Sequence, residues 1–400
     1  MRCDFCDMEA GKNMIHYKGK EICQQCALAI TGFYRRGQGN KKEAYNGRNI
    51  LLPQQLYDRI SEYVIGQEDA KKTLCVAAYI HQLRIRGLVS ENVGKSNILL
   101  LGPTGSGKTY MVNSLAKALG VPFVSISAAS LTEAGYAGES VSGVIQRLYA
   151  AAGGEIEKAE TGIVFIDEID KLCVRGTNTK TVGVTGVQQE LLTMLEGTEI
   201  DVDPQFMTIG IQTSGTQRMI NTSKILFICG GAFPELENIV ASRMDCGNRI
   251  GFGAHPEEKG ERRDILSLVE NEDLVQFGMI PELIGRLPVK CALSALSLEE
   301  MKKILCDCKG SVISQYQELF YACGVKLEVS EDAVGEMAKK AKSSKTGARA
   351  LRSVAEETFH RLLFEIPGRS DIQKLIVTKE FVCGEDDVMV VKKMTAVSGV

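Results

Sequence analysis

The chain has no tryptophan, and only 6% of its 400 residues are aromatic. Bases of single-stranded nucleic acids stack on aromatic side chains, so this composition offers few platforms for them. The formal net charge is only −3, from 47 basic and 50 acidic side chains. A protein that holds nucleic acid by electrostatic attraction carries a clear basic excess. Both scarcities argue against a nucleic-acid partner.

Long apolar runs are missing as well. No stretch reaches the roughly 20 apolar residues that span a bilayer, and residues 1–20 contain no continuous apolar segment of the kind found in a secretory signal. We therefore expect a cytoplasmic protein without a membrane partner. In a reducing compartment, most of the 13 cysteines would be free thiols or metal ligands.

Four cysteines lie in two pairs near the start of the chain. Two residues separate Cys3 from Cys6 and Cys23 from Cys26, and sixteen residues separate the pairs. Each pair can offer two thiolates to one ion, so the pattern predicts a tetrahedral, structural Zn²⁺ site. A module of this size needs such a metal because its own core is too small to hold it together. His16 lies between the pairs and is expected to be a surface residue.

The chain divides into four predicted segments. Residues 1–33 form the zinc module, and residues 34–48 are basic, contain glycine and asparagine, and resemble a flexible linker. Residues 49–294 alternate strand-like and helical patterns, which predicts a large α/β domain with a parallel sheet. Residues 295–400 predict a small, mostly helical C-terminal domain that ends in a strand-like stretch at 374–393.

Within the large domain, apolar runs at 97–101, 162–166 and 224–229 predict buried parallel strands. Helical patterns at 140–152 and 187–196 lie between them. Strands that alternate with helices favour a doubly wound sheet.

The first apolar run is followed by a glycine-rich loop, G-P-T-G-S-G-K-T, at residues 102–109. Between a strand and a helix, this pattern binds nucleotide phosphates through backbone N–H groups and the helix N-terminus. Lys108 is expected to reach the β- and γ-phosphates of ATP, and Thr109 to ligate Mg²⁺. The expected nucleotide-binding residues of this segment are Gly102, Pro103, Thr104, Gly105, Ser106, Gly107, Lys108, Thr109 and Tyr110.

The second apolar run ends in two carboxylates. Asp167 is expected to hold Mg²⁺, and Glu168 to orient and polarise the attacking water. A phosphate loop followed about sixty residues later by an acidic strand end predicts ATP hydrolysis. Asp170 and Lys171 are expected to form a solvated, ion-pairing face.

Together these segments resemble the ClpX family of AAA+ protein unfoldases, the partners of the ClpP peptidase, from Cys3 to about Ile372. The motifs that carry the resemblance are the four-cysteine head, YVIGQ at 63–67, GPTGSGKT at 102–109, GYAG at 135–138, IDEIDK at 166–171, ILFICGGAF at 225–233, IPELIGRLP at 280–288 and GARALR at 347–352.

The resemblance implies an ATPase with P-loop large and helical small domains that assembles into a homohexamer. It implies that ATP hydrolysis draws protein substrates through an axial pore and delivers them to ClpP, with adaptors bound by the zinc module. The alternative that stays open is an ATP-driven remodeller of protein complexes that works without a peptidase. The family itself is not a peptidase.

The resemblance also implies roles for single residues. Val64 and Ile65 would pack around the adenine, although a place in the core before a helix is the alternative. Arg286 corresponds to the arginine finger that reaches the γ-phosphate in a neighbouring subunit, and Arg349 to the second sensor arginine. Tyr136 corresponds to the pore-loop aromatic residue that grips the translocated chain.

One tripeptide favours a proteolytic partner. Ile250, Gly251 and Phe252 match the motif by which these unfoldases dock on ClpP, and they lie between polar stretches that suit an exposed loop.

The chain departs from the family at three places. Residues 199–221 lack the basic cluster of the pore-entrance loop and contain one cation, Arg218, which predicts weaker capture of tags that end in a free carboxylate. The segment 172–186, which corresponds to a second pore loop, is short. Tyr110 stands where an aliphatic residue is common.

Overall fold

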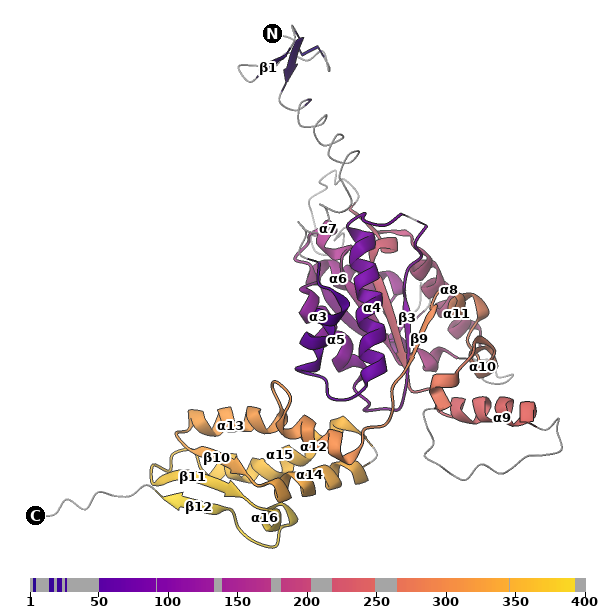
Figure 1. The fold of residues 1–400 in the computed structure, drawn as a ribbon. Coiled ribbons are helices and arrows are strands. Elements are labelled where there is room, and N and C mark those ends of the chain that lie inside the picture. The colour runs from indigo at the N-terminus through magenta and orange to yellow at the C-terminus, as the bar shows by residue number, and fades with distance from the viewer. Residues whose placement is uncertain are drawn as a thin grey trace, which may run out of the picture.

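The computed structural model describes residues 3–4, 14–17, 20–23, 26, 50–90, 92–132, 139–173, 181–202, 218–248, 265–344 and 346–392. Figure 1 shows a larger lobe at the centre and a smaller lobe, with α12 to α16, at the lower left. The predicted linker, 34–48, lies outside the described residues. The predicted segment boundaries at 33, 48 and 294 stay predictions.

A short hairpin lies near the start of the chain. Strand β1 (Met14–Tyr17) pairs antiparallel with β2 (Lys20–Cys23), so that Met14 lies opposite Cys23. The hairpin therefore places one zinc-ligand candidate at the end of a strand.

A five-stranded sheet runs through the larger lobe in the order β4-β5-β8-β3-β9, and all of its neighbouring strands are parallel. Its strands are β3 (Ile98–Leu101), β4 (Phe123–Ser127), β5 (Ile163–Asp167), β8 (Leu226–Gly231) and β9 (Val289–Ala292). The three predicted apolar runs are confirmed as β3, β5 and β8, which occupy the middle of the sheet. Strands covered on both faces read as continuous apolar runs, and this explains why the sequence marks them clearly.

Helices cover one face of this sheet at α3 (Pro53–Ser61), α4 (Glu68–Ile85) and α5 (Lys108–Leu119). Successive side chains of a strand point to opposite faces. Ile98 and Leu100 of β3 therefore join Leu74 of α4 and Leu115 of α5 in one buried cluster.

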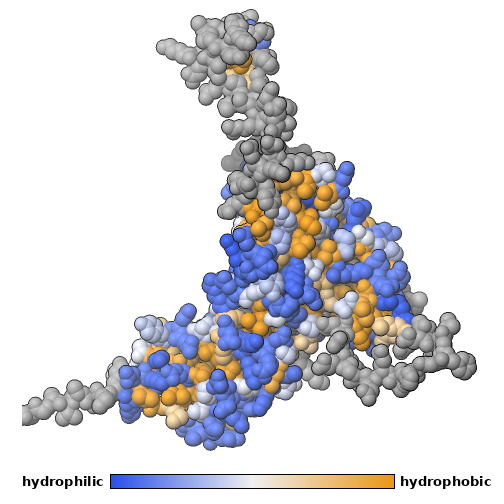
Figure 2. All heavy atoms as spheres, viewed as in Figure 1, coloured by the Kyte–Doolittle hydropathy of each residue, from blue (hydrophilic) through white to orange (hydrophobic). Residues whose placement is uncertain are grey.

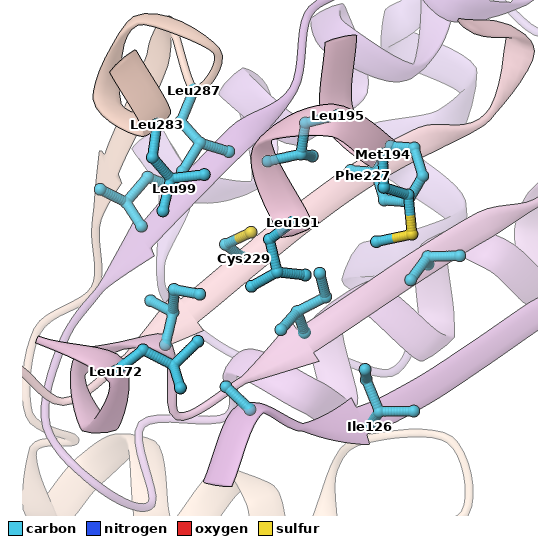
Figure 3. Close-up of a cluster of buried hydrophobic side chains, with 14 of the residues drawn as sticks. Leu99, Ile126, Leu172, Leu191, Met194, Leu195, Phe227, Cys229, Leu283 and Leu287 are labelled. Carbon is cyan, nitrogen blue, oxygen red and sulfur yellow. The ribbon is translucent and has the colours of Figure 1, made fainter. Parts of the chain in front are cut away.

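The other face carries a second set of helices. They are α6 (Val141–Ala151), α7 (Ile156–Ala159), α8 (Thr181–Glu196), α9 (Leu236–Asn248), α10 (Asn271–Phe277) and α11 (Pro281–Gly285). Figure 3 shows Leu191 and Leu195 of α8 packed over the sheet, in the same cluster as Leu99 of β3 and Phe227 of β8. Helices on both faces of a parallel sheet confirm the predicted doubly wound α/β architecture.

Short elements complete the larger lobe. The strands β6 (Glu199–Asp201) and β7 (Met219–Asn221) form an antiparallel pair. The 3₁₀ helices are η1 (Ala128–Ser130), η2 (Ile169–Leu172), η3 (Thr222–Lys224) and η4 (Ile265–Leu268).

Helix α8 is longer than its sequence pattern predicts. The pattern at 187–196 covers only the C-terminal part of the helix, which already begins at Thr181. Part of the segment 172–186, which was expected to be a loop, is therefore helical.

The smaller lobe has a separate buried cluster and a three-stranded sheet in the order β10-β11-β12. Its elements are α12 (Leu298–Cys306), α13 (Val312–Ala322), β10 (Lys326–Val329), α14 (Glu331–Ser343), α15 (Ala348–Glu365), β11 (Ile372–Val377), α16 (Lys379–Cys383) and β12 (Met389–Lys392). Serines cap two of these helices: Ser297 Oγ accepts from the N–H of Glu300, and Ser330 Oγ accepts from the N–H of Ala333.

The prediction of a strand-like stretch at residues 374–393 is wrong for the middle of that stretch. Thr378 caps the short helix α16 through the N–H of Phe381, so β11 ends at Val377 and the chain does not return to a strand until β12. The capping hydroxyl satisfies a helix N–H that a strand would leave for pairing.

The surface of this view mixes polar and apolar residues over both lobes (Figure 2). In the part of the chain that the structure describes, no helix combines the length and apolar character needed to cross a membrane.

Candidate functional site

The glycine-rich loop joins β3 to α5. Gly105 and Gly107 have φ values of +79° and +93°, a left-handed conformation that other residues rarely adopt. Helix α5 begins at Lys108, directly after Gly107. The turn therefore directs loop N–H groups and a helix N-terminus toward one place, which suits an anion.

Lys108 is folded back onto this loop. Its Nζ donates to the carbonyl oxygens of Gly102 (2.6 Å) and Pro103 (3.0 Å). Burial lowers the pKa of Lys108, and the charges of Asp167 and Asp170 oppose that shift. A buried ammonium group whose hydrogen-bond acceptors are neutral carbonyls gains from an anionic ligand, so the loop fits a phosphate.

The acidic end of β5 lies beside the start of α5. Thr109 Oγ1 donates to Asp167 Oδ2 over 2.8 Å. Hydroxyl and carboxylate oxygens are the ligand types that Mg²⁺ prefers. The two residues predicted to hold this ion are therefore adjacent, and their donor atoms fit it.

Glu168 has an unusual backbone. Its φ is +58°, a left-handed conformation that costs a non-glycine residue about 1–2 kcal/mol. Its Oε2 accepts a hydrogen bond of 2.8 Å from Ser127 Oγ, at the end of the neighbouring strand β4. Sequence reasoning missed Ser127, because the pairing of β4 with β5 brings it here from 41 residues away.

The expectation for Asp170 is wrong. This carboxylate is only 8% exposed, and its Oδ1 accepts from the N–H of Ala232 after β8 (3.2 Å). Asp170 therefore ties η2 to the end of β8 instead of forming a solvated face, while Lys171 is exposed as expected.

A cavity of about 630 Å³ opens between the two lobes. Volumes of this size are ordinary for small-molecule sites. The cavity gathers the glycine-rich loop, the acidic end of β5 and the start of α15. The predicted residues on its wall are Val64, Ile65, Thr104, Gly105, Ser106, Gly107, Lys108, Thr109, Tyr110, Asp167, Glu168 and Arg349.

One part of the cavity is apolar and aromatic. Val64 is 7% exposed, Tyr110 is 49% exposed, and both share the wall with Tyr63, Cys308 and Val312. Cys308 and Val312 come from the smaller lobe, so this wall needs both lobes. An apolar wall in the same cavity as a phosphate loop suits the base of a nucleotide.

Of the cavity residues in the smaller lobe, sequence reasoning found Arg349 and missed the others. Arg352 lines the cavity together with Arg349. The two arginines are three positions apart on α15 and share one helix face, a spacing that could have revealed the second cation.

The two lobes touch at the glycine-rich loop itself. The N–H of Ala348, at the start of α15, donates to the carbonyl oxygen of Gly105 (2.9 Å). Gly347 has a φ of +62°, and a Cβ added there would lie 2.7 Å from the same oxygen. The position of the smaller lobe is thus linked directly to the loop that fits phosphate.

Arg286 does not line the cavity. It follows α11, and its Nε and Nη2 donate to Glu196 Oε1 over 3.0 Å and 2.7 Å. Arg286 therefore lies outside the cavity wall, and its role as an arginine finger stays a prediction.

Three of the four predicted zinc ligands lie together. The sulfur atoms of Cys3, Cys23 and Cys26 are all within 4.8 Å of one another. The N–H of Cys23 donates to Cys3 Sγ (3.2 Å), and the N–H of Cys26 donates to Cys23 Sγ (3.4 Å). Converging sulfurs that accept backbone N–H bonds fit thiolate ligands of Zn²⁺.

Several predicted residues lie outside the described part of the chain. They are Cys6, Tyr136, Ile250, Gly251 and Phe252, together with most of the pore-entrance segment, 203–217.

Comparisons with known proteins agree with this geometry. The family described as AAA domain (Cdc48 subfamily) matches residues 94–290, and the C-terminal, D2-small domain of ClpB protein matches residues 296–377. A protein of Borrelia duttonii named ATP-dependent Clp protease ATP-binding subunit ClpX is 41% identical over 392 residues, which cover 95% of this chain and 90% of that protein. The chain belongs to the ClpX family.

Two other members of the ClpX family cover the chain to a similar extent. The ClpX of Treponema denticola is 40% identical and covers 95% of this chain and 93% of its own length. The protein named ClpX 3 of Methylococcus capsulatus is 39% identical and covers 98% of this chain and 94% of its own length. The alignments thus extend over nearly the whole chain, and the AAA domain identifies the chain as an ATPase of this family.

Proposed function

We propose that this chain is an ATP-driven protein unfoldase that works as a homohexamer and delivers unfolded polypeptide to a ClpP-type peptidase. The observation that carries the proposal is the cavity between the lobes, on whose wall Lys108, Asp167, Glu168 and Arg349 meet. The printed names of the relatives, ATP-binding subunits of the Clp protease, support the peptidase as partner.

Bound ATP with Mg²⁺ supplies the phosphoanhydride bond and the metal charge. Lys108 and the N–H groups of its loop orient the phosphates, while Thr109 and Asp167 offer oxygen ligands to the metal. Glu168, once released by Ser127, accepts a proton from water at its carboxylate. These residues bind and orient the phosphates before any motion begins.

Motion arises at the contact between the lobes. Arg349 lies on α15, which begins at the hydrogen bond from Ala348 to Gly105. An arginine that binds a triphosphate more tightly than a diphosphate makes the angle between the two lobes depend on which nucleotide is bound. In a ring, that change of angle moves the pore residue Tyr136 against the threaded substrate.

The first experiment tests the chemistry with Glu168→Gln. The amide cannot accept a proton from water, so kcat for ATP hydrolysis falls by about 10² to 10⁴-fold. The Kd for ATP stays close to that of the parent, because Lys108 and its loop are unchanged. Glu157→Gln, an exposed carboxylate on α7, is the matched control and leaves both quantities unchanged. Parent-like hydrolysis by Glu168→Gln would contradict the proposed chemistry.

The second experiment tests whether the protein unfolds a client and delivers it to ClpP. The assembled protein is mixed with ATP, a folded fluorescent client and ClpP, and both the loss of fluorescence and the release of peptides are measured. The proposal expects both signals, and it expects Phe252→Ala to abolish peptide release while the loss of fluorescence remains. Loss of fluorescence with no peptide release from the parent would instead identify a remodeller that works without a peptidase.

A further inference from the structure

An ion pair on the larger lobe joins two residues that are distant in the sequence. Both Nε and Nη2 of Arg286 donate to Glu196 Oε1, although 90 residues separate them. The contact uses one edge of the guanidinium. Three of the five N–H donors of the planar guanidinium then stay available for an anionic ligand such as a phosphate group.

The backbone that carries Glu196 is held firmly. Lys95 Nζ donates to the carbonyl oxygens of Leu195 (3.1 Å) and Thr222 (2.9 Å). Thr222, which is completely buried, donates from its hydroxyl to the carbonyl oxygen of Met194 (2.9 Å). Two residues next to Glu196 at the end of α8 are thus fixed by side chains from other segments.

The backbone that carries Arg286 is held by the same part of the chain. Asn97 Nδ2 donates to the carbonyl oxygen of Arg286 (3.1 Å), and Asn97 itself is 1% exposed. Leu195 and Leu287, the neighbours of the two paired residues, belong to one buried cluster (Figure 3). Both charged side chains therefore project from rigid backbone supported by residues 95 to 97.

Stability alone gives a weak reason for this pair. The two side chains are 53% and 45% exposed, and ion pairs this exposed contribute little to the stability of the fold. Glu196 is also the last residue of α8, where a negative charge opposes the helix dipole. The contribution of the Glu196 carboxylate therefore lies in its contact with the guanidinium. This contact restricts the orientations of the long, flexible Arg286 side chain.

We propose that Glu196 is a positioning residue for Arg286: it fixes the outward orientation of the guanidinium, so that the free edge reaches the phosphate of ATP in the neighbouring subunit. The inference rests on the proposed function, in which Arg286 acts across the subunit interface. It adds a residue from α8 that sets how well the finger is aligned, through contact with Arg286 and not with the nucleotide.

The experiment measures steady-state ATP hydrolysis by the assembled full-length protein. Glu196→Ala lowers kcat about tenfold, because a poorly oriented group loses much of its effect in the transition state. KM for ATP stays within about twofold, since the residues that line the nucleotide cavity belong to the other subunit. Glu196→Gln keeps an acceptor oxygen and loses less than Glu196→Ala. Glu157→Ala, at an exposed carboxylate on α7, is the matched control and retains the parent kcat.

A double-mutant cycle distinguishes a role of Glu196 in positioning Arg286 from a general structural role of Glu196. Arg286→Ala lowers kcat by about 10³-fold or more, as the loss of an arginine finger does. Adding Glu196→Ala to Arg286→Ala then causes no further loss. A further tenfold loss in the double variant, or parent-like kcat for Glu196→Ala alone, would overturn the inference. Parent-like kcat for Arg286→Ala would instead overturn the finger role in the proposed function, and this inference with it.

Mixed assemblies supply a readout that a purely structural role would not change. Subunits that carry Glu168→Gln are themselves inactive, so hydrolysis in a mixture comes from parent subunits. Adding Glu196→Ala to the inactive subunits lowers turnover in their parent neighbours, whose finger they supply. If turnover of the mixture does not depend on Glu196 in the inactive subunits, the inference is wrong. Thermal melting and light scattering check that each variant folds and assembles like the parent.

Discussion

Buried and half-buried polar side chains gather near the N-terminal end of β3, the opposite end of this strand from the glycine-rich loop. His81 and Gln82 of α4 are 5% and 7% exposed, and Lys95 and Asn97 precede the strand. Burial, with smaller contributions from the charges of Arg84 and Lys95, lowers the pKa of His81 to about 4. A histidine kept neutral in this way links the folding of the larger lobe to pH.

The first prediction concerns this histidine. The ordinary pKa of a histidine side chain is 6.5, so between pH 6.5 and about 4 the unfolded chain binds a proton that the folded chain does not. The stability that neutral His81 contributes is present above pH 6.5 and is lost as the pH falls. At pH 5 the loss amounts to about 2 kcal/mol. Urea unfolding of the parent and of His81→Gln at pH 7 and pH 5 should show a smaller pH effect in the variant.

The comparison between variants removes the effect of the carboxylates, which titrate in both proteins. His360→Gln, a change at an exposed histidine of α15, is the control and should keep the full pH dependence of the parent. An equal pH effect in the parent and in His81→Gln would mean that His81 is not the group that titrates.

The sequence predicts the roles of residues that lie within one motif. It does not predict roles that depend on contacts between residues distant in the sequence. Lys108 and Thr109 are adjacent in the sequence, and their strand and helix context could be recognised. The partners Ser127 of Glu168 and Glu196 of Arg286 come from 41 and 90 residues away. A serine or glutamate carries no local signal of such a contact, because strand order and helix packing decide it.

At the scale of elements, the sequence predicts best where burial is uniform or a cap is explicit. The central strands β3 and β8 are apolar at almost every position, and Ser297 and Ser330 mark real helix starts. Helix α16 was missed because it has only five residues, too few to establish a helical period, and its apolar residues resemble a strand.

The contact between the glycine-rich loop and the start of α15 also belongs to the scale of elements. Gly347→Ala is predicted to weaken nucleotide binding about tenfold or more, because the added methyl group collides with the Gly105 backbone and disfavours φ of +62°. Arg349, two residues further along, then moves away from the cavity. Titration with a non-hydrolysable ATP analogue measures the Kd, and the unfolding of the smaller lobe shows whether its core is retained.

Gly368→Ala provides the matched control for this change. Gly368 has a φ of +94°, so alanine is strained there too, but no atom lies within 4 Å of the added Cβ. The control is expected to lose some stability and to bind the analogue like the parent. If both variants bind equally, the close approach of the lobes does not contribute to nucleotide affinity.

At the scale of the whole molecule, three buried clusters hold the described part of the chain together. Two lie on opposite faces of the five-stranded sheet, and one lies in the smaller lobe. Cys3, Cys23 and Cys26 belong to none of them. The cavity depends on both lobes but has no wall residue from the N-terminal hairpin. Metal binding by the cysteines and nucleotide chemistry should therefore be separable.

Removal of zinc tests this separation. A zinc-selective chelator, used with excess Mg²⁺, is expected to release one zinc ion per chain and to leave kcat for ATP hydrolysis within about twofold, because structural zinc stabilises the fold that its own ligands enclose. Zinc binding should weaken as the pH falls, since the thiols must lose their protons. Cys23→Ser should abolish zinc binding, whereas Cys306→Ser, at an exposed thiol of α12, should retain it. A large fall in ATP hydrolysis on chelation would show that the zinc module and the ATPase lobes depend on each other.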